Sequence, residues 1–168
     1  VSAKQAGEAL SDLRVRPETA AAVIIPNYIN GELFGYVKKA PEMRKRILSI
    51  RPFASSVYAN DLSVEAIRLL AHEPFFDNLT FRIVGDGPLF DETVEPIRHL
   101  PNVELTRGFL TQREIARLHK EYGVFLVPSR MDSQGVSRDE AMASGLVPVT
   151  TRIAAIPEFV DEQCAFLA

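Results

Sequence analysis

Residues 124–151 read VFLVPSRMDSQGVSRDEAMASGLVPVTT and contain a complete strand–helix–strand pattern. Two short apolar runs, 124–128 and 147–151, flank a segment with helical periodicity at 137–144. Short runs of Val, Leu and Phe on either side of a helix are typical of parallel strands that are buried on both faces. The stretch therefore predicts an α/β fold, and the same pattern can be sought in the rest of the chain.

The alternation of apolar runs and helical segments extends back to residue 46. We expect further strands at 46–50, 80–85 and 103–108, and helices at 60–72, 89–100 and 111–122. This alternation predicts a Rossmann-like, doubly wound parallel sheet. Before it, the sequence predicts a helix at about Ser2 to Leu13, an apolar strand at 21–26 and an irregular linker at 27–43. The chain opens within a helical pattern and closes on an apolar run, which predicts a piece of a longer protein.

The composition is that of a globular protein. Of the 168 residues, 46% are hydrophobic and 24% are charged, and the net charge is -3. This charge argues against binding to a nucleic-acid backbone. No apolar run approaches the roughly 20 residues that span a bilayer, so membrane association is expected only through regions outside this chain. The sole cysteine, Cys164, precedes an apolar run, which predicts a buried, inert thiol and fits a cytoplasmic location.

The loops that follow the strands are the expected places for a ligand, because parallel sheets bind ligands at the carboxyl ends of their strands. Gly85 and Gly87 directly follow one strand. They would let a ligand approach the backbone closely, or they would simply form a tight turn. Phe90 stands where the third glycine of a G-x-G-x-x-G pattern would be, so no nicotinamide-dinucleotide fingerprint is predicted.

Two further loops carry candidate ligand-binding residues. Gly108, Phe109 and Leu110 combine a flexible backbone with an apolar face and could hold a flat base. The next residues satisfy a capping box, with Thr111 and Glu114, and need no ligand. Arg51 follows the first strand, where it could hold phosphate oxygens through two parallel hydrogen bonds or pair with a surface acid.

The loop within the opening stretch contains two carboxylates, Asp132 and Glu140. A capping box of Ser137 and Glu140 would explain the second but not the first. The helix that follows has free N–H groups and a positive dipole end, which suit an anion. Carboxylates would repel that anion, so they are expected to contact neutral hydroxyls of a sugar or ribose. We see no side-chain set that would bind a metal tightly.

The loop resembles the E-x₇-E region of retaining glycosyltransferases with the GT-B fold, of the family 4 type. The usual form includes P-S-x-x-E-x-x-G-x-x-x-x-E-A-M-A-x-G, and Asp132 replaces its first glutamate. The positions in register are Pro128, Ser129, Gly135, Glu140, Ala141, Met142, Ala143 and Gly145. Four other segments resemble the family in the same order: VIIPNYINGELF, ILSIRPF, FRIVGDGP and VELTRGFLTQREIARLHKEYGVFLVPS.

The resemblance implies one half of a GT-B fold. Residues 1–40 would be the end of an amino-terminal domain and the interdomain linker, and residues 41–168 would be the nucleotide-sugar-binding domain. The enzyme would transfer a sugar, with retention, from a UDP- or GDP-linked donor to a hydroxyl acceptor, and no metal or other cofactor is expected. A sugar, lipid-linked or protein acceptor would bind through the amino-terminal domain.

The resemblance also assigns roles to individual residues. Arg51 and Asp132 would be the catalytic residues, neutralising the diphosphate and contacting donor-sugar hydroxyls respectively, with help from the backbone of Gln134 and Gly135. Glu140 would accept hydrogen bonds from the ribose hydroxyls. The other expected donor-site residues are Gly85, Gly87, Gly108, Phe109, Leu110, Ser129 and Arg130.

One departure from the family keeps an alternative open. The family follows its arginine with a Lys-Gly pair that grips the diphosphate, whereas this chain has no lysine between Arg46 and His119. Arg130 would then be a substitute for the lysine. A module that binds a nucleotide or sugar phosphate without catalysis is the alternative function, and a flavodoxin-like, flavin-binding domain is a third.

Overall fold

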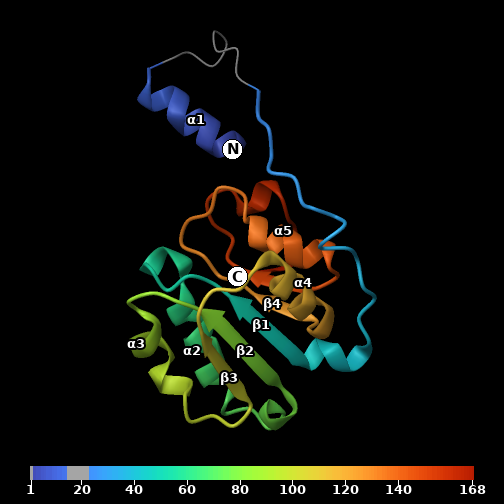
Figure 1. Ribbon diagram of the computed structural model, residues 1–168. Helices are drawn as coiled ribbons and strands as arrows, with labels where there is room; N and C mark the ends of the chain where they lie inside the picture. The colour runs from blue at the N-terminus through green and yellow to red at the C-terminus, as the bar shows by residue number, and fades with distance from the viewer. Residues whose placement is uncertain (1, 15–22) are drawn as a thin grey trace.

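The computed structural model describes residues 2–14 and 23–168. Its centre is a six-stranded sheet with the order β3-β2-β1-β4-β5-β6, in which all paired strands are parallel (Figure 1). The strands are β1 (Arg46–Ile50), β2 (Thr80–Gly85), β3 (Val103–Arg107), β4 (Val124–Leu126), β5 (Val147–Thr150) and β6 (Phe166–Leu167). The direction of the strand order reverses between β1 and β4. This arrangement confirms the predicted Rossmann-like, doubly wound sheet.

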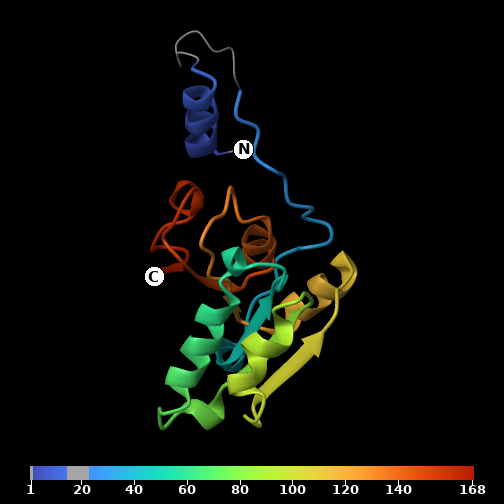
Figure 2. The ribbon, with the colours of Figure 1, turned by 90° about the vertical axis from the view of Figure 1, so that its left-hand side faces the viewer.

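Helices cover both faces of the sheet, and each layer has its own apolar core. On one face α2 (Asn60–Leu70) and α3 (Phe90–Val94) lie side by side, as Figure 2 shows. The core beneath them includes Ile67, Phe81 and Phe90. On the other face α4 (Gln112–Glu121) and α5 (Val136–Ala143) contribute to a second core. That core includes Leu48, Leu118, Phe125 and Ala141.

Three local predictions are wrong. The expected helix 89–100 breaks after Val94 into a 3₁₀ turn, Glu95–Ile97, because Pro96 has no backbone N–H to continue the helix. Of the expected strand 21–26, residues 21 and 22 lie outside the described residues, and 23–26 join none of the six strands. Val23 there is 84% exposed. An apolar run becomes a strand only where a partner strand can pair with it.

The third wrong prediction concerns Cys164, which is exposed rather than buried. It lies in a turn in which its Sγ donates to the Asp161 carbonyl oxygen at 3.5 Å. The neighbouring Ala165 occupies the buried position instead. The short strand β6, which follows this turn, is not predicted by the sequence.

The segment 23–40 passes alongside α5 and α4 before it enters the sheet domain (Figure 1). Its anchor is Phe34, which is 1% exposed and lies 5.6 Å, between ring centroids, from His119 of α4. The backbone N–H of Val37 donates to the carbonyl of Ser144 at 3.4 Å, and Lys39 Nζ donates to the carbonyl of His119. The segment is therefore packed onto the same face of the domain as α4 and α5.

The first helix, α1 (Ala3–Asp12), stands apart from the sheet in both ribbon views. Its amino terminus is held by the Glu158 carboxylate, which accepts hydrogen bonds from the N–H groups of Ala3 at 2.7 Å and Lys4 at 2.9 Å. A carboxylate at this end also suits the positive end of the helix dipole. None of the helices within residues 2–14 and 23–168 has the length and hydrophobicity needed to cross a membrane.

Candidate functional site

The carboxyl ends of β1, β2 and β3 surround a pocket of about 160 Å³. Its lining includes five of the predicted site residues: Arg51, Gly85, Gly108, Phe109 and Leu110. The other lining residues are Ile50, Pro52 and Ile115. Phe109 is 78% exposed, so its ring is free to pack against a flat ligand. The structure thus brings the loops after three neighbouring strands together at one apolar surface with an arginine beside it.

Arg51 is held at the end of β1 with an incompletely paired side chain. Its backbone N–H donates to the Val84 carbonyl at 3.0 Å, which extends the β1–β2 pairing. The guanidinium lies 5.2 Å from the Tyr58 ring centroid, and its buried Nε has no hydrogen-bond partner among the described residues. Burial lowers the pKa of Arg51, and the charge of Asp132 opposes this shift. The group stays cationic, since arginine keeps its proton in proteins, and is available to an anion.

Gly85 and Gly87 are required by packing. A Cβ at Gly85 would overlap the Arg51 carbonyl oxygen, and one at Gly87 would overlap the backbone of Phe53. Gly87 also has a φ of 147°, which side-chain-bearing residues rarely adopt. The two glycines let the β1 and β2 loops approach each other closely, which fixes the position of Arg51. The tight-turn interpretation therefore explains Gly87, while Gly85 also lines the pocket.

Ser129 and Arg130 tie the loop after β4 to the end of β5 and to the first turn of α2. Ser129 Oγ donates to the Met131 carbonyl at 2.9 Å, and the Ser129 N–H donates to Thr151 Oγ1 at 3.0 Å. The Arg130 guanidinium makes two hydrogen bonds to the Asp61 carboxylate, at 2.7 and 2.6 Å. This pairing raises the pKa of Arg130. Arg130 is thus engaged by Asp61 rather than aimed at a phosphate position.

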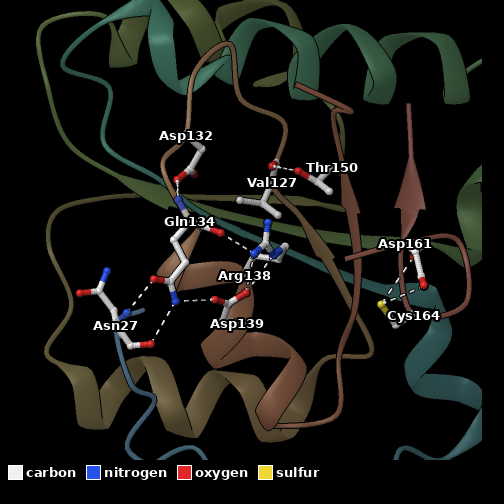
Figure 3. Close-up of polar contacts among 9 residues, drawn as sticks. All are labelled: Asn27, Val127, Asp132, Gln134, Arg138, Asp139, Thr150, Asp161 and Cys164. Atoms are coloured by element: carbon white, nitrogen blue, oxygen red, sulfur yellow. Dashed lines mark hydrogen bonds and ion pairs between the residues drawn. The ribbon is translucent and has the colours of Figure 1, made fainter. Parts of the chain in front are cut away.

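Asp132, Gln134 and Gly135 form the turn that leads into α5 (Figure 3). Asp132 Oδ1 accepts a hydrogen bond from the Gln134 N–H at 3.1 Å, so the short side chain folds toward the backbone. Gly135 is the N-cap residue of α5, with φ 84° and ψ 51°, a conformation that favours glycine. A capping box of Ser137 and Glu140 is wrong, because the helix begins at Val136 and both residues lie inside it.

Glu140 projects from α5 into a second pocket, of about 380 Å³. The lining comes from three elements: Asn27, Tyr28, Asn30 and Phe34 of the segment 23–40, Gln112 of α4, and Val136 and Glu140 of α5. Burial raises the pKa of the Glu140 carboxyl, and the charge of Asp139 adds to the shift. A partly desolvated carboxylate gains from hydroxyl donors, so the pocket suits a ligand with neutral hydroxyls.

The first turn of α4 joins the two pockets, because Ile115 lines one and Gln112 lines the other. The predicted capping box is present there: Thr111 Oγ1 accepts from the Glu114 N–H at 3.3 Å, and Glu114 accepts from the Thr111 N–H at 2.7 Å. No group of three or more His, Cys, Asp or Glu side chains arranged to hold a metal occurs within the described ranges, 2–14 and 23–168.

Sequence reasoning missed the contribution of the segment 23–40 to the Glu140 pocket. It also missed the buried side chain of Arg138 and its partly buried partner Asp139, which both bond to Gln134. The sequence signal for this network was the pair of charges at the start of α5, which stands one residue before a run of small and apolar side chains. A charge pair next to a buried stretch indicates a buried polar network.

A family model described as Glycosyl transferases group 1 matches residues 44–168. The chain belongs to this family. The match covers all six strands of the sheet and both pockets except for the part contributed by the segment 23–40.

A curated protein is similar to this glycosyl transferase group 1 domain over most of its length. Sulfoquinovosyl transferase SQD2 of Arabidopsis thaliana is 28% identical over 139 residues, which are 80% of this chain and 26% of that protein. The chain therefore spans about a quarter of that relative.

Two solved structures share the fold. WaaG, a glycosyltransferase involved in lipopolysaccharide biosynthesis, superimposes with a TM-score of 0.74 at 19% identity, covering 99% of this chain and 47% of WaaG. The C-terminal domain of the group 1 family protein LpcC from Francisella tularensis gives a TM-score of 0.63 at 18% identity, covering 84% of this chain and 80% of that one.

Proposed function

We propose that this glycosyl transferase group 1 domain binds the nucleoside-diphosphate sugar of a retaining glycosyltransferase. The observation that carries the proposal is the grouping of Arg51 with Gly108, Phe109 and Leu110 around one pocket. This pocket lies at the carboxyl ends of the strands, next to the point where the strand order reverses, and doubly wound sheets bind nucleotides there.

In the proposed complex the base packs against the apolar pocket and the diphosphate lies beside Arg51. The departing nucleoside diphosphate gains negative charge as the bond to the sugar breaks. A fixed, buried cation stabilises this charge in the transition state more than in the ground state. Arg51 suits this role because burial and the packing of Gly85 hold its backbone in place.

The two carboxylates take the hydroxyl contacts. Glu140 accepts hydrogen bonds from the ribose in the pocket that it shares with the segment 23–40. Asp132 contacts a hydroxyl of the donor sugar with the oxygen that the Gln134 N–H does not occupy. Because Oδ1 is drawn to the backbone, the sugar is expected to approach the turn at Gln134 and Gly135 closely. UDP and GDP are the proposed nucleotides, and no resident metal or other cofactor is part of the proposal.

The acceptor is assigned to a domain outside this chain. Activity therefore requires that domain, and a sugar, a lipid-linked or a protein hydroxyl would serve as acceptor there. A cytoplasmic location belongs to the proposal because the exposed thiol of Cys164 fits a reducing compartment.

The test is calorimetric titration of the chain with UDP, GDP and ADP, repeated on Glu140→Gln. We expect one nucleotide to bind, and the variant to bind it about tenfold to a hundredfold more weakly, because a charged hydrogen-bond partner of the ribose is lost. The thermal unfolding midpoint of the variant should stay within about 2 °C of the wild-type value, since Glu140 does not cap α5. Equal affinity of the variant and the wild type for the nucleotide would show that Glu140 does not contact it.

The non-catalytic alternative rests on one observation: Arg130 pairs with Asp61, so Arg51 has no second arginine beside it from this loop. Turnover separates the two functions. After the preceding domain is supplied, a transferase consumes its donor, at least by hydrolysis, whereas a binding module retains the bound donor intact. Confirmed binding of a donor without any consumption would favour the module.

A further inference from the structure

The turn before α5 is tied to the segment 23–40 by a series of hydrogen bonds, shown in Figure 3. The series joins the backbone of Asn27 to the side chains of Gln134, Asp139 and Arg138, and we call it the Gln134 relay. Gln134 is 4% exposed and Arg138 is 1% exposed. Buried polar groups are costly unless their hydrogen bonds are made, so these hydrogen bonds hold the buried side chains of Gln134 and Arg138 in one arrangement.

The Gln134 side chain pairs with the backbone of residue 27 in both directions. The Asn27 N–H donates to Gln134 Oε1 at 2.8 Å, and Gln134 Nε2 donates to the Asn27 carbonyl at 3.0 Å. The two residues are 107 positions apart in the sequence. Gln134 thus takes the place that a neighbouring strand would take beside residue 27, and it fixes both the position and the orientation of that peptide group.

The other end of the relay fixes the turn and the start of α5. Gln134 Nε2 also donates to Asp139 Oδ2 at 3.1 Å, and Asp139 Oδ1 accepts from Arg138 Nε at 3.0 Å and Nη2 at 2.6 Å. Arg138 Nη2 also donates to the Gln134 carbonyl, so the hydrogen bonds return to the residue at which they began. Arg138 Nη1 lies against Gly135, where a Cβ would come within 2.9 Å of it. Every polar group of Gln134 is therefore engaged, including the N–H that holds Asp132.

The relay connects two walls of the Glu140 pocket. Asn27, Tyr28, Asn30 and Phe34 form one wall, and Val136 and Glu140 of α5 form the other. A pocket of this kind has its full shape only when both walls are in place. Phe34 anchors the far end of the first wall against His119, while the Asn27 end is held by Gln134.

We propose that the Gln134 relay couples the docking of the segment 23–40 to the order of residues 132–139, the turn and the start of α5, with Gln134, Asp139 and Arg138 as positioning residues for the hydroxyl-binding pocket. The coupling itself is a property of the ligand-free chain. Its consequence for ligand binding, a donor pocket that forms only when the segment is docked, rests on the proposed function.

The first test breaks one end of the relay and observes the other. Asn27→Pro removes the N–H that donates to Gln134, whereas the matched control Asn27→Ala keeps it. Hydrogen–deuterium exchange of the ligand-free proteins is measured by mass spectrometry on peptides that cover 132–139. We expect exchange there to rise about fivefold to tenfold in Asn27→Pro, the effect of losing one partly buried hydrogen bond, and to stay at the wild-type rate in Asn27→Ala.

The second test runs in the opposite direction. Gln134→Leu is expected to raise exchange in peptides covering 23–34 by a similar factor, and the control Gln163→Leu, at an exposed position, is expected to leave it unchanged. If Gln134→Leu unfolds the domain, Gln134→Glu replaces it, because it keeps the shape and the acceptor but loses the Nε2 donor. Unchanged exchange at 132–139 in Asn27→Pro, or at 23–34 in both Gln134 variants, overturns the coupling.

A third experiment measures the affinity of the variants for the nucleoside diphosphate that binds the wild type. Affinity is expected to fall about fivefold to tenfold in Asn27→Pro relative to Asn27→Ala. Equal affinities, together with altered exchange, would overturn the link between the relay and the pocket. If the wild type binds no nucleoside diphosphate, the proposed function fails, and the exchange experiments on the ligand-free chain still decide the coupling.

Discussion

Gly85→Ala is expected to destabilise the domain by about 3 kcal/mol or more, at the upper end of the cost of overpacking a core. The added Cβ would overlap the Arg51 carbonyl oxygen and come within 2.9 Å of the Phe53 ring. Both neighbours are buried, and one of them is backbone, so neither can move aside without disturbing the junction of β1 and β2. The substitution is therefore expected to displace Arg51 as well as to weaken the fold.

Equilibrium unfolding in urea measures this effect, with two variants for comparison. Gly7→Ala adds a Cβ in α1, where nothing lies within 4 Å, and replaces glycine in a helix. It should leave stability unchanged or raise it by up to about 1 kcal/mol. Gly108→Ala meets no neighbour but has a φ of 148°, so it should cost less than Gly85→Ala. Equal stability of Gly85→Ala and wild type would show that the β1 and β2 loops can separate.

Acid is expected to destabilise the domain through His119, by about 3 kcal/mol between pH 6.5 and pH 4. Burial and the charge of Lys39 lower the pKa of His119 to about 4. Its ring packs between Phe34 and Phe125, its Nδ1 is 3.3 Å from Ser144 Oγ, and its Nε2 has no partner among the described residues. The folded state thus holds this histidine neutral.

The direction of this pH effect on the free energy of unfolding follows from proton binding to the two states. Above pH 6.5 both the folded and the unfolded states have a neutral His119, and stability is complete. As the pH falls from 6.5 to 4 only the unfolded state takes up the proton, so unfolding becomes progressively easier; below pH 4 the loss is complete. A difference of about 2.5 pKa units corresponds to about 3 kcal/mol.

His119→Leu removes this titration and is the variant to compare. Ser144 Oγ keeps its hydrogen bond to the Glu140 carbonyl at 3.0 Å, so the substitution leaves no new unpaired hydroxyl. The free energy of unfolding, measured from pH 7 to pH 4, should fall by about 3 kcal/mol less in the variant than in the wild type. The control His99→Gln, at an exposed position, should follow the wild-type curve. Parallel curves for wild type and His119→Leu would contradict a buried, neutral His119.

Most of the fold could be predicted because its strands are buried on both faces. Runs such as RILSI and VFLVP stand out from the helical segments between them, and their alternation leaves few topologies other than a doubly wound sheet. The strand β6 could not be predicted, because Phe166 and Leu167 are too few to show a period. The expected strand fails in its described part, 23–26, for another reason: this apolar run pairs with none of the six strands of the sheet.

The candidate site could be predicted only in its local parts. The sequence points to Arg51, Gly108 and Glu140 because each is close to the end of a strand or the start of a helix, and each lines one of the two pockets. The wall that Asn27 and Phe34 contribute to the Glu140 pocket depends on contacts between distant parts of the chain, which no local pattern reveals. For the same reason the pairing of Arg130 with Asp61 could not be predicted.

The position of the bound nucleotide decides whether the pocket beside Arg51 is the donor site. Amide chemical shifts of the ¹⁵N-labelled chain would be followed while the nucleoside diphosphate that binds in calorimetry is added. We expect the largest shifts at Arg51 and its neighbours, at residues 108–110, and at residues 132–140 in the turn and the start of α5. Shifts confined to the amino ends of the strands, around Asn102 and Tyr122, or no shifts at saturating nucleotide, would contradict this position.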